Sequence, residues 1–400
     1  MGLPPSSYRP VFSQRDDVQE ERGSVKVLVF SPALGSAGGI QRYTVTLVRA
    51  LKELCGGASV RVVSMRTTEG RGRRRYSQAL KLRFGFEALG EVARWRPDLI
   101  ICTHLALGPL AWLAAAVGER HCWIVVHGIE AWGWLPYGKR AALRRAGRVV
   151  VTSAFNREQV VKRQGIERSR ISRLPCALDE TLLCAESSTG PTAAATRNRL
   201  QRYFADDRRV LLTVARMAAS ERYKGHEVVL EALPSVLARI PNLTYAVVGD
   251  GDDRARLERL AAELGLGGHV VFTGEVSDAE LAALYRRSEI FVLPARTVIE
   301  DRSPKGEGFG IVFLEAMAFG KPVIGPNYGA PAELIRHGEN GLLVDPEDPT
   351  SVTEALLKLL TDPGEASKMG KAGTDWVENH YSYGSFRERL REELLSAVDS

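Results

Sequence analysis

Residues 307–315 read Glu-Gly-Phe-Gly-Ile-Val-Phe-Leu-Glu, and they follow an apolar run, Ile290–Pro294, that is typical of a buried strand. Gly308 and Gly310 predict a tight turn that opens a helix, and Glu315 falls about one turn inside that helix. The unpaired N–H groups of such a first turn can bind phosphate or sugar oxygens. This order of strand, glycine turn and helix predicts a parallel α/β sheet whose ligand lies at the carboxyl ends of its strands.

The same alternation of apolar runs and helical segments extends through the whole chain, which predicts two parallel sheets covered by helices on both faces. A small polar segment, residues 185–195, separates two series of runs and is typical of a linker. Helix starts are predicted at Ser277, whose Glu280 completes a capping box, and at Asp348-Pro349. The predicted strands are Val25–Ser31, Val60–Ser64, Asp98–Thr103, Cys122–His127, Arg148–Ser153 and Ile171–Leu174, then Val210–Ala215, Thr244–Gly249, Val270–Thr273, Ile290–Pro294, Pro322–Gly325 and Gly341–Val344.

The predicted fold class is therefore α/β, with two Rossmann-like, doubly wound domains that face each other across a cleft. We expect a polar N-terminal extension over residues 1–24 and an N-terminal domain over 25–190. A C-terminal domain should cover 207–375, followed by a C-terminal helix over 376–400.

Charge is distributed unevenly along the chain. Residues 1–180 hold 29 Lys and Arg against 15 Asp and Glu, whereas residues 181–400 hold 25 against 33. A basic half predicts an anionic partner, such as a membrane surface or a lipid phosphate, unless these side chains are simply solvated. Nucleic acid is a poor candidate because no recognition motif accompanies the charge. The two densest basic patches are Arg71, Arg73, Arg74, Arg75, Lys81 and Arg83, and Lys139, Arg140, Arg144, Arg145 and Arg148.

The composition, 44% hydrophobic and 26% charged, is that of an ordinary globular protein. Five cysteines without C-x-x-C spacing indicate a reducing compartment and argue against a zinc site. The first 24 residues lack an apolar signal core, and the longest apolar run, Leu105–Gly118, is too short to cross a bilayer and is typical of a buried helix. We therefore expect a cytoplasmic protein, either free or bound peripherally to the inner face of the cell membrane.

Two cations are candidates for binding a diphosphate. Arg216 lies just past the predicted strand Val210–Ala215, and Lys224 follows eight residues later. Both charges can neutralise phosphate oxygens, and the arginine can do so bidentately. Taken alone, an arginine and a lysine on a loop are more often solvated.

Two glutamates of the opening stretch are candidates for hydroxyl groups. Glu307 precedes the glycine turn, where its carboxylate can accept hydrogen bonds from a sugar, and Glu315 can accept both hydroxyls of a ribose. Apolar neighbours flank Glu315 on both sides, so a solvated helix face is a poor explanation for it.

Two other patterns suggest rival sites. The glycine-rich turn over residues 32–43 lacks the G-x-G-x-x-G spacing of a nicotinamide dinucleotide site, and Met65-Arg66 stand where an acidic ribose ligand is expected. Asp250-Gly-Asp252-Asp253 resembles a metal-binding D-x-D pair. Because it follows a buried strand and opens a helix, helix N-capping is the preferred explanation.

As an ordered set, these residues resemble family 4 of the GT-B glycosyltransferases over about residues 24–395. The resemblance rests on Arg216, Lys224 and the E-x7-E pair, with residues 247–252 and 284–294 between them. Within the family the chain is similar to bacterial phosphatidylinositol and exopolysaccharide mannosyltransferases. That similarity rests on Gly38-Gly-Ile-Gln41, the stretch His127–Trp134 and a polar insertion before Glu307.

The resemblance implies a retaining hexosyltransferase that needs no metal and moves a sugar to a lipid-linked or glycan acceptor. The preferred sugar and donor are mannose and GDP-mannose. It also implies that the donor binds the C-terminal domain, that the acceptor binds the basic N-terminal domain, and that the C-terminal helix returns to the latter. Gly39 would present its N–H to the donor phosphate or to the anomeric region, and His127 would contact the sugar near its 6-hydroxyl. Some relatives have an acid directly after this histidine, but here Gly128 follows and the acid is Glu130, whose role stays open. The implied catalytic residues are His127, Arg216, Lys224 and Glu307, and the implied donor-binding residues are Gly38, Gly39, Val276, Gly308, Phe309, Gly310, Ile311 and Glu315.

Two alternatives stay open. The donor could be UDP-glucose or UDP-N-acetylglucosamine, with a soluble or natural-product acceptor, since the family recognises the base largely by backbone near Gly274–Val276. The chain could also be a non-catalytic sugar-nucleotide-binding protein, which the complete set of charged residues argues against. No carboxylate is convincingly placed as a covalent nucleophile, so attack on the face of departure, with the leaving phosphate as base, is the preferred mechanism.

Overall fold

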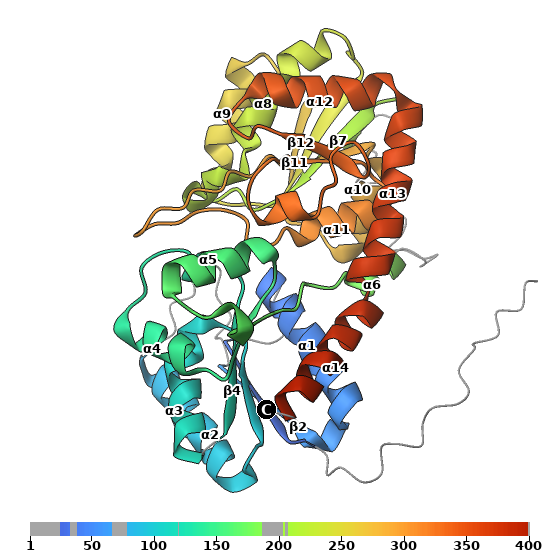
Figure 1. Cartoon of the computed structure of the whole chain (residues 1–400). Helices are drawn as coiled ribbons and strands as arrows, with labels where there is room; N and C mark the ends of the chain where they lie inside the picture. The colour runs from blue at the N-terminus through green and yellow to red at the C-terminus, as the bar shows by residue number, and fades with distance from the viewer. Residues whose placement is uncertain are drawn as a thin grey trace, which may run out of the picture.

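The computed structural model describes residues 25–32, 38–65, 78–118, 120–185, 203–204 and 207–398, and they form two α/β domains that lie end to end (Figure 1). Each domain is built on a parallel six-stranded sheet, with strand order β2-β1-β3-β4-β5-β6 in the N-terminal domain and β12-β11-β10-β7-β8-β9 in the C-terminal domain. Doubly wound sheets are therefore confirmed in both halves. The exact boundaries expected for the domains stay predictions.

The elements of the N-terminal domain alternate regularly between strand and helix. Its strands are β1 (Val27–Ser31), β2 (Val60–Ser64), β3 (Leu99–Cys102), β4 (His121–Val126), β5 (Arg148–Val151) and β6 (Ile171–Arg173). Its helices are α1 (Gly39–Cys55), α2 (Gln78–Trp95), α3 (Gly108–Gly118), α4 (Tyr137–Arg145), α5 (Ala154–Gln164) and α6 (Glu180–Cys184), with short 3-10 turns η1 (Gly57–Ser59), η2 (Leu105–Leu107), η3 (Ile129–Ala131) and η4 (Arg168–Arg170).

The C-terminal domain repeats the pattern. Its strands are β7 (Arg209–Val214), β8 (Leu243–Val248), β9 (Val270–Gly274), β10 (Ile290–Val292), β11 (Val323–Pro326) and β12 (Gly341–Val344). Its helices are η5 (Ala219–Lys224), α8 (His226–Leu237), α9 (Arg254–Glu263), α10 (Asp278–Arg287), α11 (Ile311–Ala318), η6 (Ala330–Glu333), α12 (Pro349–Thr361) and α13 (Pro363–Tyr381). All twelve predicted strands are present, shifted at their ends by no more than two residues. Most of them are apolar runs that the sheet buries, whereas the edge strands β2 and β9 are only partly buried.

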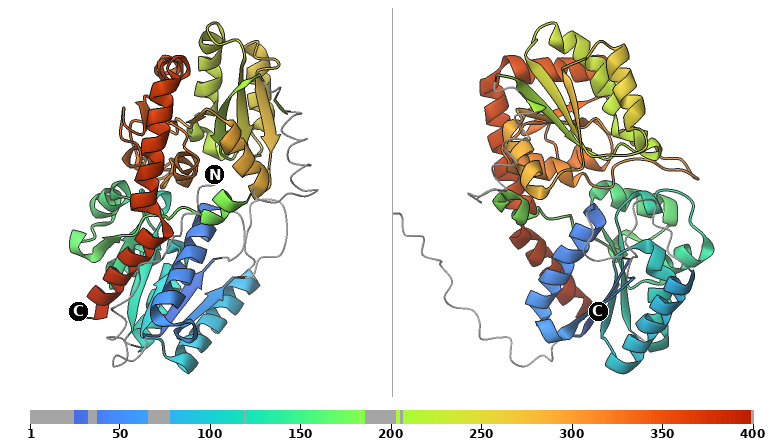
Figure 2. Two further views of the ribbon diagram at one scale, coloured as in Figure 1. Left: turned by 90° about the vertical axis from the view of Figure 1, so that its right-hand side faces the viewer. Right: turned by 180° about the vertical axis from the view of Figure 1, so that it is seen from behind.

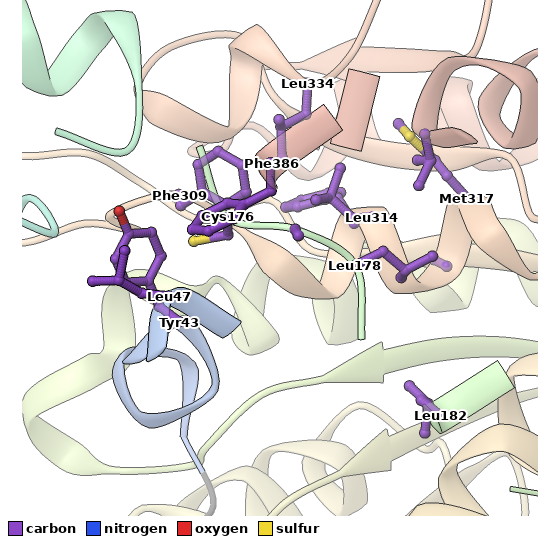
Figure 3. Packing of buried hydrophobic residues seen from close by; sticks show 14 of the residues in the cluster. Tyr43, Leu47, Cys176, Leu178, Leu182, Phe309, Leu314, Met317, Leu334 and Phe386 are labelled. Carbon is purple, nitrogen blue, oxygen red and sulfur yellow. The ribbon is translucent and has the colours of Figure 1, made fainter. Parts of the chain in front are cut away.

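One apolar cluster runs through both domains. It joins the α1 face of the N-terminal sheet to the α11 face of the C-terminal sheet, and Figure 3 shows Tyr43 and Leu47 of α1 close to Phe309 and Phe386. The opposite face of each sheet has a separate cluster of its own. The two domains therefore share part of their hydrophobic core.

The last helix, α14 (Tyr383–Val398), crosses back from the C-terminal domain and lies beside α1 of the N-terminal domain (Figures 1 and 2). The rings of Phe386 and Tyr43 meet edge to face at 5.7 Å, and the Arg49 guanidinium lies 3.9 Å from the centre of the Tyr383 ring. The predicted return of the C-terminal helix is confirmed.

The apolar run Leu105–Gly118 forms η2 and α3, but the expectation of a buried helix holds for one face only. Gly108, Ala111 and Ala115 are buried, whereas Leu113 is 49% and Val117 79% exposed. In the part of the chain that the structure describes, every helix is too short or too polar to cross a membrane.

Candidate active site

Both sheets turn their topological switch points toward the boundary between the domains. In the N-terminal sheet the strand order reverses between β1 and β3, and in the C-terminal sheet between β7 and β10. Ligands of doubly wound folds bind at such points, outside the carboxyl ends of the strands. The segments that follow these four strands carry most of the residues predicted for the site.

The two predicted cations are paired with carboxylates. Arg216, just past β7, lies 2.5 Å from Glu221 of η5, and the Arg216 side chain is 76% exposed. Lys224, at the end of η5, forms an ion pair with Glu307 and is mostly buried. Burial, together with negative charge on Glu307 and Glu221, raises the pKa of the Tyr223 hydroxyl between them. The structure therefore brings Arg216, Lys224 and Glu307 into one charged group.

The predicted glycine turn opens α11. Gly310 is its N-cap residue, with a left-handed φ of 97°, and the N–H of Phe313 donates to the Gly310 carbonyl at 3.0 Å. Phe309 is buried in the shared apolar cluster, and Ile311 packs against it. Among the described residues, no side chain caps this helix start and no acidic residue lies in its first turn. The first N–H groups of α11 thus keep their capacity to bind an anion.

Glu315 lies one turn inside α11 and is only 1% exposed, so a solvated helix face is ruled out for it. Its carboxylate accepts hydrogen bonds from Arg42 of α1 at 2.5 Å and from the Tyr285 hydroxyl at 2.8 Å. Burial raises the pKa of the Glu315 carboxyl, and the Arg42 charge opposes that rise. Glu315, the residue predicted to bind the ribose, is therefore already hydrogen-bonded to Arg42 of the opposite domain.

His127 follows β4 in the N-terminal domain. Its Nε2 lies 2.8 Å from the Thr103 carbonyl oxygen and therefore donates to it, which leaves Nδ1 for another partner. The main-chain N–H of His127 donates to Glu130 at 2.6 Å, which assigns the carboxylate of Glu130 to holding the loop. The ring of Tyr43 packs edge to face on the imidazole at 5.1 Å.

The loops that contain His127 and Glu307 touch at a pair of glycines. A Cβ atom at Gly128 would lie 2.9 Å from the Gly308 Cα, and a Cβ at Gly308 would lie 2.4 Å from the His127 carbonyl oxygen. Only residues without side chains allow the two main chains to come this close. The loops that contain the predicted catalytic residues His127 and Glu307 are therefore adjacent.

The remaining predicted donor-binding residues lie at the edges of this site. Gly38 and Gly39 begin α1, while residues 33–37 of the glycine-rich turn lie outside the described residues. Val276 lies between β9 and α10 and packs against the shared apolar cluster. Arg42 of α1 contacts both α10 and α11, since it lies 3.7 Å from Asp278 and also bonds Glu315.

The expectation that Asp250–Asp253 cap a helix is wrong. Asp253 precedes α9 without a side-chain capping bond and instead pairs with Arg222 at 2.8 Å and Arg256 at 2.6 Å. These arginines lower the pKa of the Asp253 carboxyl. Asp252 accepts the Ala219 N–H at 2.7 Å. Arginine charge outcompetes the backbone N–H groups as a partner for Asp253.

Several residues at the boundary went unnoticed in the sequence. His104 follows β3 as His127 follows β4, with ring centres 6.4 Å apart, and burial lowers the pKa of His104. The rule that site residues follow neighbouring strands would have found it. Asn156 and Glu333 contact the opposite domain, and no local sequence signal marks them.

Two doubly wound domains that meet at their switch points define the GT-B class of glycosyltransferases. The comparisons with known proteins agree. The family described as "Glycosyltransferase Family 4" matches residues 37–182, and "Glycosyl transferases group 1" matches residues 196–376. The chain therefore belongs to the family 4 glycosyltransferases and is a glycosyltransferase.

Curated relatives and solved structures give the same picture. The chain is 33% identical over 293 residues to the GDP-mannose-dependent alpha-(1-6)-phosphatidylinositol monomannoside mannosyltransferase of Mycolicibacterium smegmatis, a match that covers 72% of each protein. It is 27% identical to the alpha-D-kanosaminyltransferase of Streptomyces kanamyceticus, covering 64% of this chain and 61% of that enzyme. Sucrose-phosphate synthase of Thermosynechococcus elongatus superposes with a TM-score of 0.72 at 23% identity, and HepE of Anabaena with 0.71 at 18%. Each covers 93% of this chain and is itself covered completely, and this likeness shows the fold.

Proposed function

We propose that this enzyme transfers mannose from GDP-mannose to a lipid-linked acceptor, with retention of the anomeric configuration. The single observation that carries the proposal is the match at 33% identity to a GDP-mannose-dependent enzyme that acts on a phosphatidylinositol monomannoside. The charged group at the domain boundary supports it, because it holds the residue types that a nucleotide diphosphate sugar requires.

The leaving diphosphate is assigned to Arg216, Lys224 and the start of α11. Transfer passes through an oxocarbenium-like state while negative charge grows on the departing oxygen. Lys224 is held in place by Glu307, so its charge is preorganised at that oxygen. One such fixed donor contributes about 3 kcal/mol to the transition state.

We further propose that no divalent metal is required. The acidic residues that most resemble a metal site are already bonded, Asp253 to arginines and Asp252 to a main-chain N–H. The cations Arg216 and Lys224 supply the charge that a metal would supply. Full activity after treatment with EDTA is expected, and activity that returns only when Mg²⁺ or Mn²⁺ is added would contradict this.

The sugar is assigned to His127 and Glu307. With its proton on Nε2, the His127 ring offers Nδ1 to a sugar hydroxyl, and Glu307 offers a carboxylate from the opposite domain. The leaving phosphate then acts as the base for the acceptor hydroxyl on the same face. Mass-spectrometric detection of a mannosyl-enzyme adduct would contradict this mechanism.

A basic and apolar surface on the N-terminal domain supports a membrane-bound acceptor. Helices α2 and α3 lie side by side (Figure 1), and α2 exposes Leu82, Phe86 and Leu89 on one stripe. Exposed Lys81 and Arg83 flank the Leu82 end of the stripe, and exposed Glu87 lies next to Phe86. Apolar side chains flanked by cations suit the surface of an anionic bilayer. Of the two basic patches, Arg71, Arg73, Arg74 and Arg75 lie outside the described residues. We propose a peripheral position on the cytoplasmic face of the membrane, which the five free cysteines also favour.

A donor panel tests the transfer. The protein is incubated with GDP-mannose, UDP-glucose or UDP-N-acetylglucosamine and with phosphatidylinositol mannosides, and products are identified by mass spectrometry. We expect release of GDP and an acceptor heavier by one hexose. Consumption of a UDP-sugar instead would overturn the donor, and a thermal shift without release of any nucleotide diphosphate would indicate a binding protein.

Vesicle flotation tests the surface. Binding to vesicles that contain phosphatidylglycerol should fall for Phe86→Ser and for the charge reversal Lys81→Glu/Arg83→Glu, and it should be weak with phosphatidylcholine alone. Equal binding by the variants and the wild-type protein would contradict this surface.

A further inference from the structure

Asn156, the third residue of α5, is completely buried and bonds to both domains. Its Nδ2 donates to the Gly308 carbonyl in the C-terminal domain at 2.8 Å and to the Thr152 hydroxyl at 2.8 Å, with the His127 carbonyl at 3.1 Å. Its Oδ1 accepts the Trp132 indole N–H at 3.0 Å. A single amide thus links the loop of His127 to the residue that follows Glu307.

The start of α5 also receives a carboxylate from the opposite domain. Glu333 of η6 accepts the N–H of Ala154 at 2.9 Å through Oε2 and the N–H of Phe155 through Oε1. Ser153 accepts the next one, from Asn156, at 3.0 Å. The first three N–H groups of α5 are therefore satisfied, and two of them by the C-terminal domain. A carboxylate in this position also interacts favourably with the helix dipole.

These bonds surround the place where Gly128 and Gly308 meet. Because the two main chains are this close, a displacement of the domains by the width of one side chain would break the Asn156 and Glu333 hydrogen bonds at the same time. Contacts of this kind define one relative position of the domains rather than a range.

We infer that Asn156 and Glu333 are positioning residues for sugar transfer, and that together with the Gly128–Gly308 contact they form an α5 clamp that fixes the catalytic arrangement of the two domains. The inference rests on the proposed assignment of His127 and Glu307 to the sugar, because the clamp sets the distance between these two residues. Neither clamp side chain needs to touch the donor.

The clamp predicts a specific kinetic signature. Arg216, Lys224 and Glu315, which are assigned to the diphosphate and ribose, belong to the C-terminal domain, whereas the N-terminal domain supplies the expected contacts of Gly38, Gly39 and His127. Most of the donor's binding therefore does not depend on the clamp. Transfer also requires His127, and a misplacement of about 1 Å costs on the order of 100-fold in rate. Loss of the clamp should therefore lower kcat and leave the KM for the donor nearly unchanged.

The test compares Asn156→Asp with the wild-type protein. This substitution keeps the size and the acceptor for Trp132, but it replaces both N–H donors with a carboxylate oxygen that faces the Gly308 carbonyl. We expect kcat to fall ~100-fold with the donor KM within about threefold, and small-angle scattering with bound nucleoside diphosphate to show a more extended molecule. Lowering the pH should restore part of the activity, since the introduced carboxyl group regains one donor when it is protonated.

Thr152→Val is the matched control. It removes an acceptor of the same amide within the N-terminal domain and leaves the bond to Gly308. We expect lower stability but nearly unchanged kcat. If Asn156→Asp does not fold, Glu333→Gln carries the test, because Glu333 is partly exposed; it should lower kcat ~10-fold. If both single variants fold, the double variant should lose less than the two effects combined.

Three results would overturn the clamp. They are an unchanged kcat in folded Asn156→Asp, a rise in donor KM at constant kcat, and identical scattering of the variant and the wild-type protein with GDP or UDP. Failure of the proposed function has a different signature. A wild-type protein that transfers no mannose refutes the donor, while scattering with nucleotide still tests the clamp.

Discussion

Two helices begin at the domain boundary, and their starts differ. The N–H groups at the start of α5 bond to Ser153 and to Glu333, which comes from the opposite domain. The start of α11, after Gly310, has no side-chain cap within the described part of the chain. Both starts have the same attraction for anions. The first is bonded across the domains, and the second is the one that we propose for the donor diphosphate.

Removal of the cation beside the available start should have the largest effect. Lys224→Ala leaves Glu307 without its partner and takes away charge at the departing diphosphate, so we expect kcat to fall ~100-fold or more, about 3 kcal/mol. Arg216→Ala and Glu307→Ala should behave similarly. Release of GDP measures the effect, with Lys305→Ala, on the same loop, as the control. Normal turnover in a folded Arg216→Ala, Lys224→Ala or Glu307→Ala protein would refute these assignments.

The next largest effect concerns Glu315, one turn inside α11, whose carboxylate is already paired with Arg42 of the N-terminal domain. Arg42→Met leaves a buried carboxylate unpaired, which should cost about 1–3 kcal/mol at pH 7, less than for a fully buried pair because the Arg42 side chain is 28% exposed. Thermal unfolding across pH measures it.

The pH dependence follows from the raised pKa of Glu315. A carboxyl whose pKa is higher in the folded state contributes stability that is complete below the unfolded value, about 4.3, and is lost as pH rises through the folded value. Without Arg42 the folded pKa rises further, so the defect of Arg42→Met should grow from about pH 4 to pH 7. This pH-dependent loss of stability should vanish in the double variant Arg42→Met/Glu315→Gln. A loss of stability that does not change with pH would argue against the Glu315 carboxylate as its cause.

A smaller effect is expected at Gly310 itself. Its φ of 97° is unfavourable for other residues, by about 1–2 kcal/mol, and a Cβ there would lie 2.9 Å from the Phe313 ring. Gly338→Ala has the same backbone penalty, at φ 82°, without any atom within 4 Å, and is the matched control. Gly310→Ala should lose more stability than the control and should also raise the KM for the donor. Equal stability and equal donor KM of the two variants would indicate that this turn does not bind the donor.

The smallest effect should come from the exposed contact between the domains. Asp301, in the insertion before Glu307, pairs with Arg163 at 2.5 Å, but its side chain is 77% exposed. Asp301→Ala should change the free energy of unfolding by about 0.5 kcal/mol and leave kcat unchanged. Its main-chain bond from Trp134, at 2.6 Å, persists in the variant. A large loss of activity would mean that the clamp also includes the C-terminal end of α5, where Arg163 lies.

Much of the fold could be predicted because its signals are local. Each strand is an apolar run, and the capping box of Ser277 and Glu280 and the Asp348 cap are confirmed where the sequence places them. Of the residues that the sequence singled out, Lys224 and Glu307 form an ion pair in the structure, while Glu315 bonds Arg42 of the other domain.

The bonds between the domains could not be predicted in this way. Nothing near Glu315 in the sequence indicates that Arg42, 273 residues away, will bond it, and nothing near Asn156 indicates Gly308. Asp253 shows the same limit, since the arginines that take it from the helix start come partly from another loop. Local patterns specify elements and candidate ligands, while the partner of a buried polar group depends on tertiary packing.

The returning helix α14 has a consequence for biosynthesis. The face of the N-terminal sheet that α1 covers is completed by Phe386 and Leu390, which are both buried in its cluster. The N-terminal domain therefore leaves the ribosome before the helix that closes its apolar face has been translated. Until then that face is exposed to chaperones, so a chain truncated before α14 should be recovered mainly as aggregate or chaperone complex.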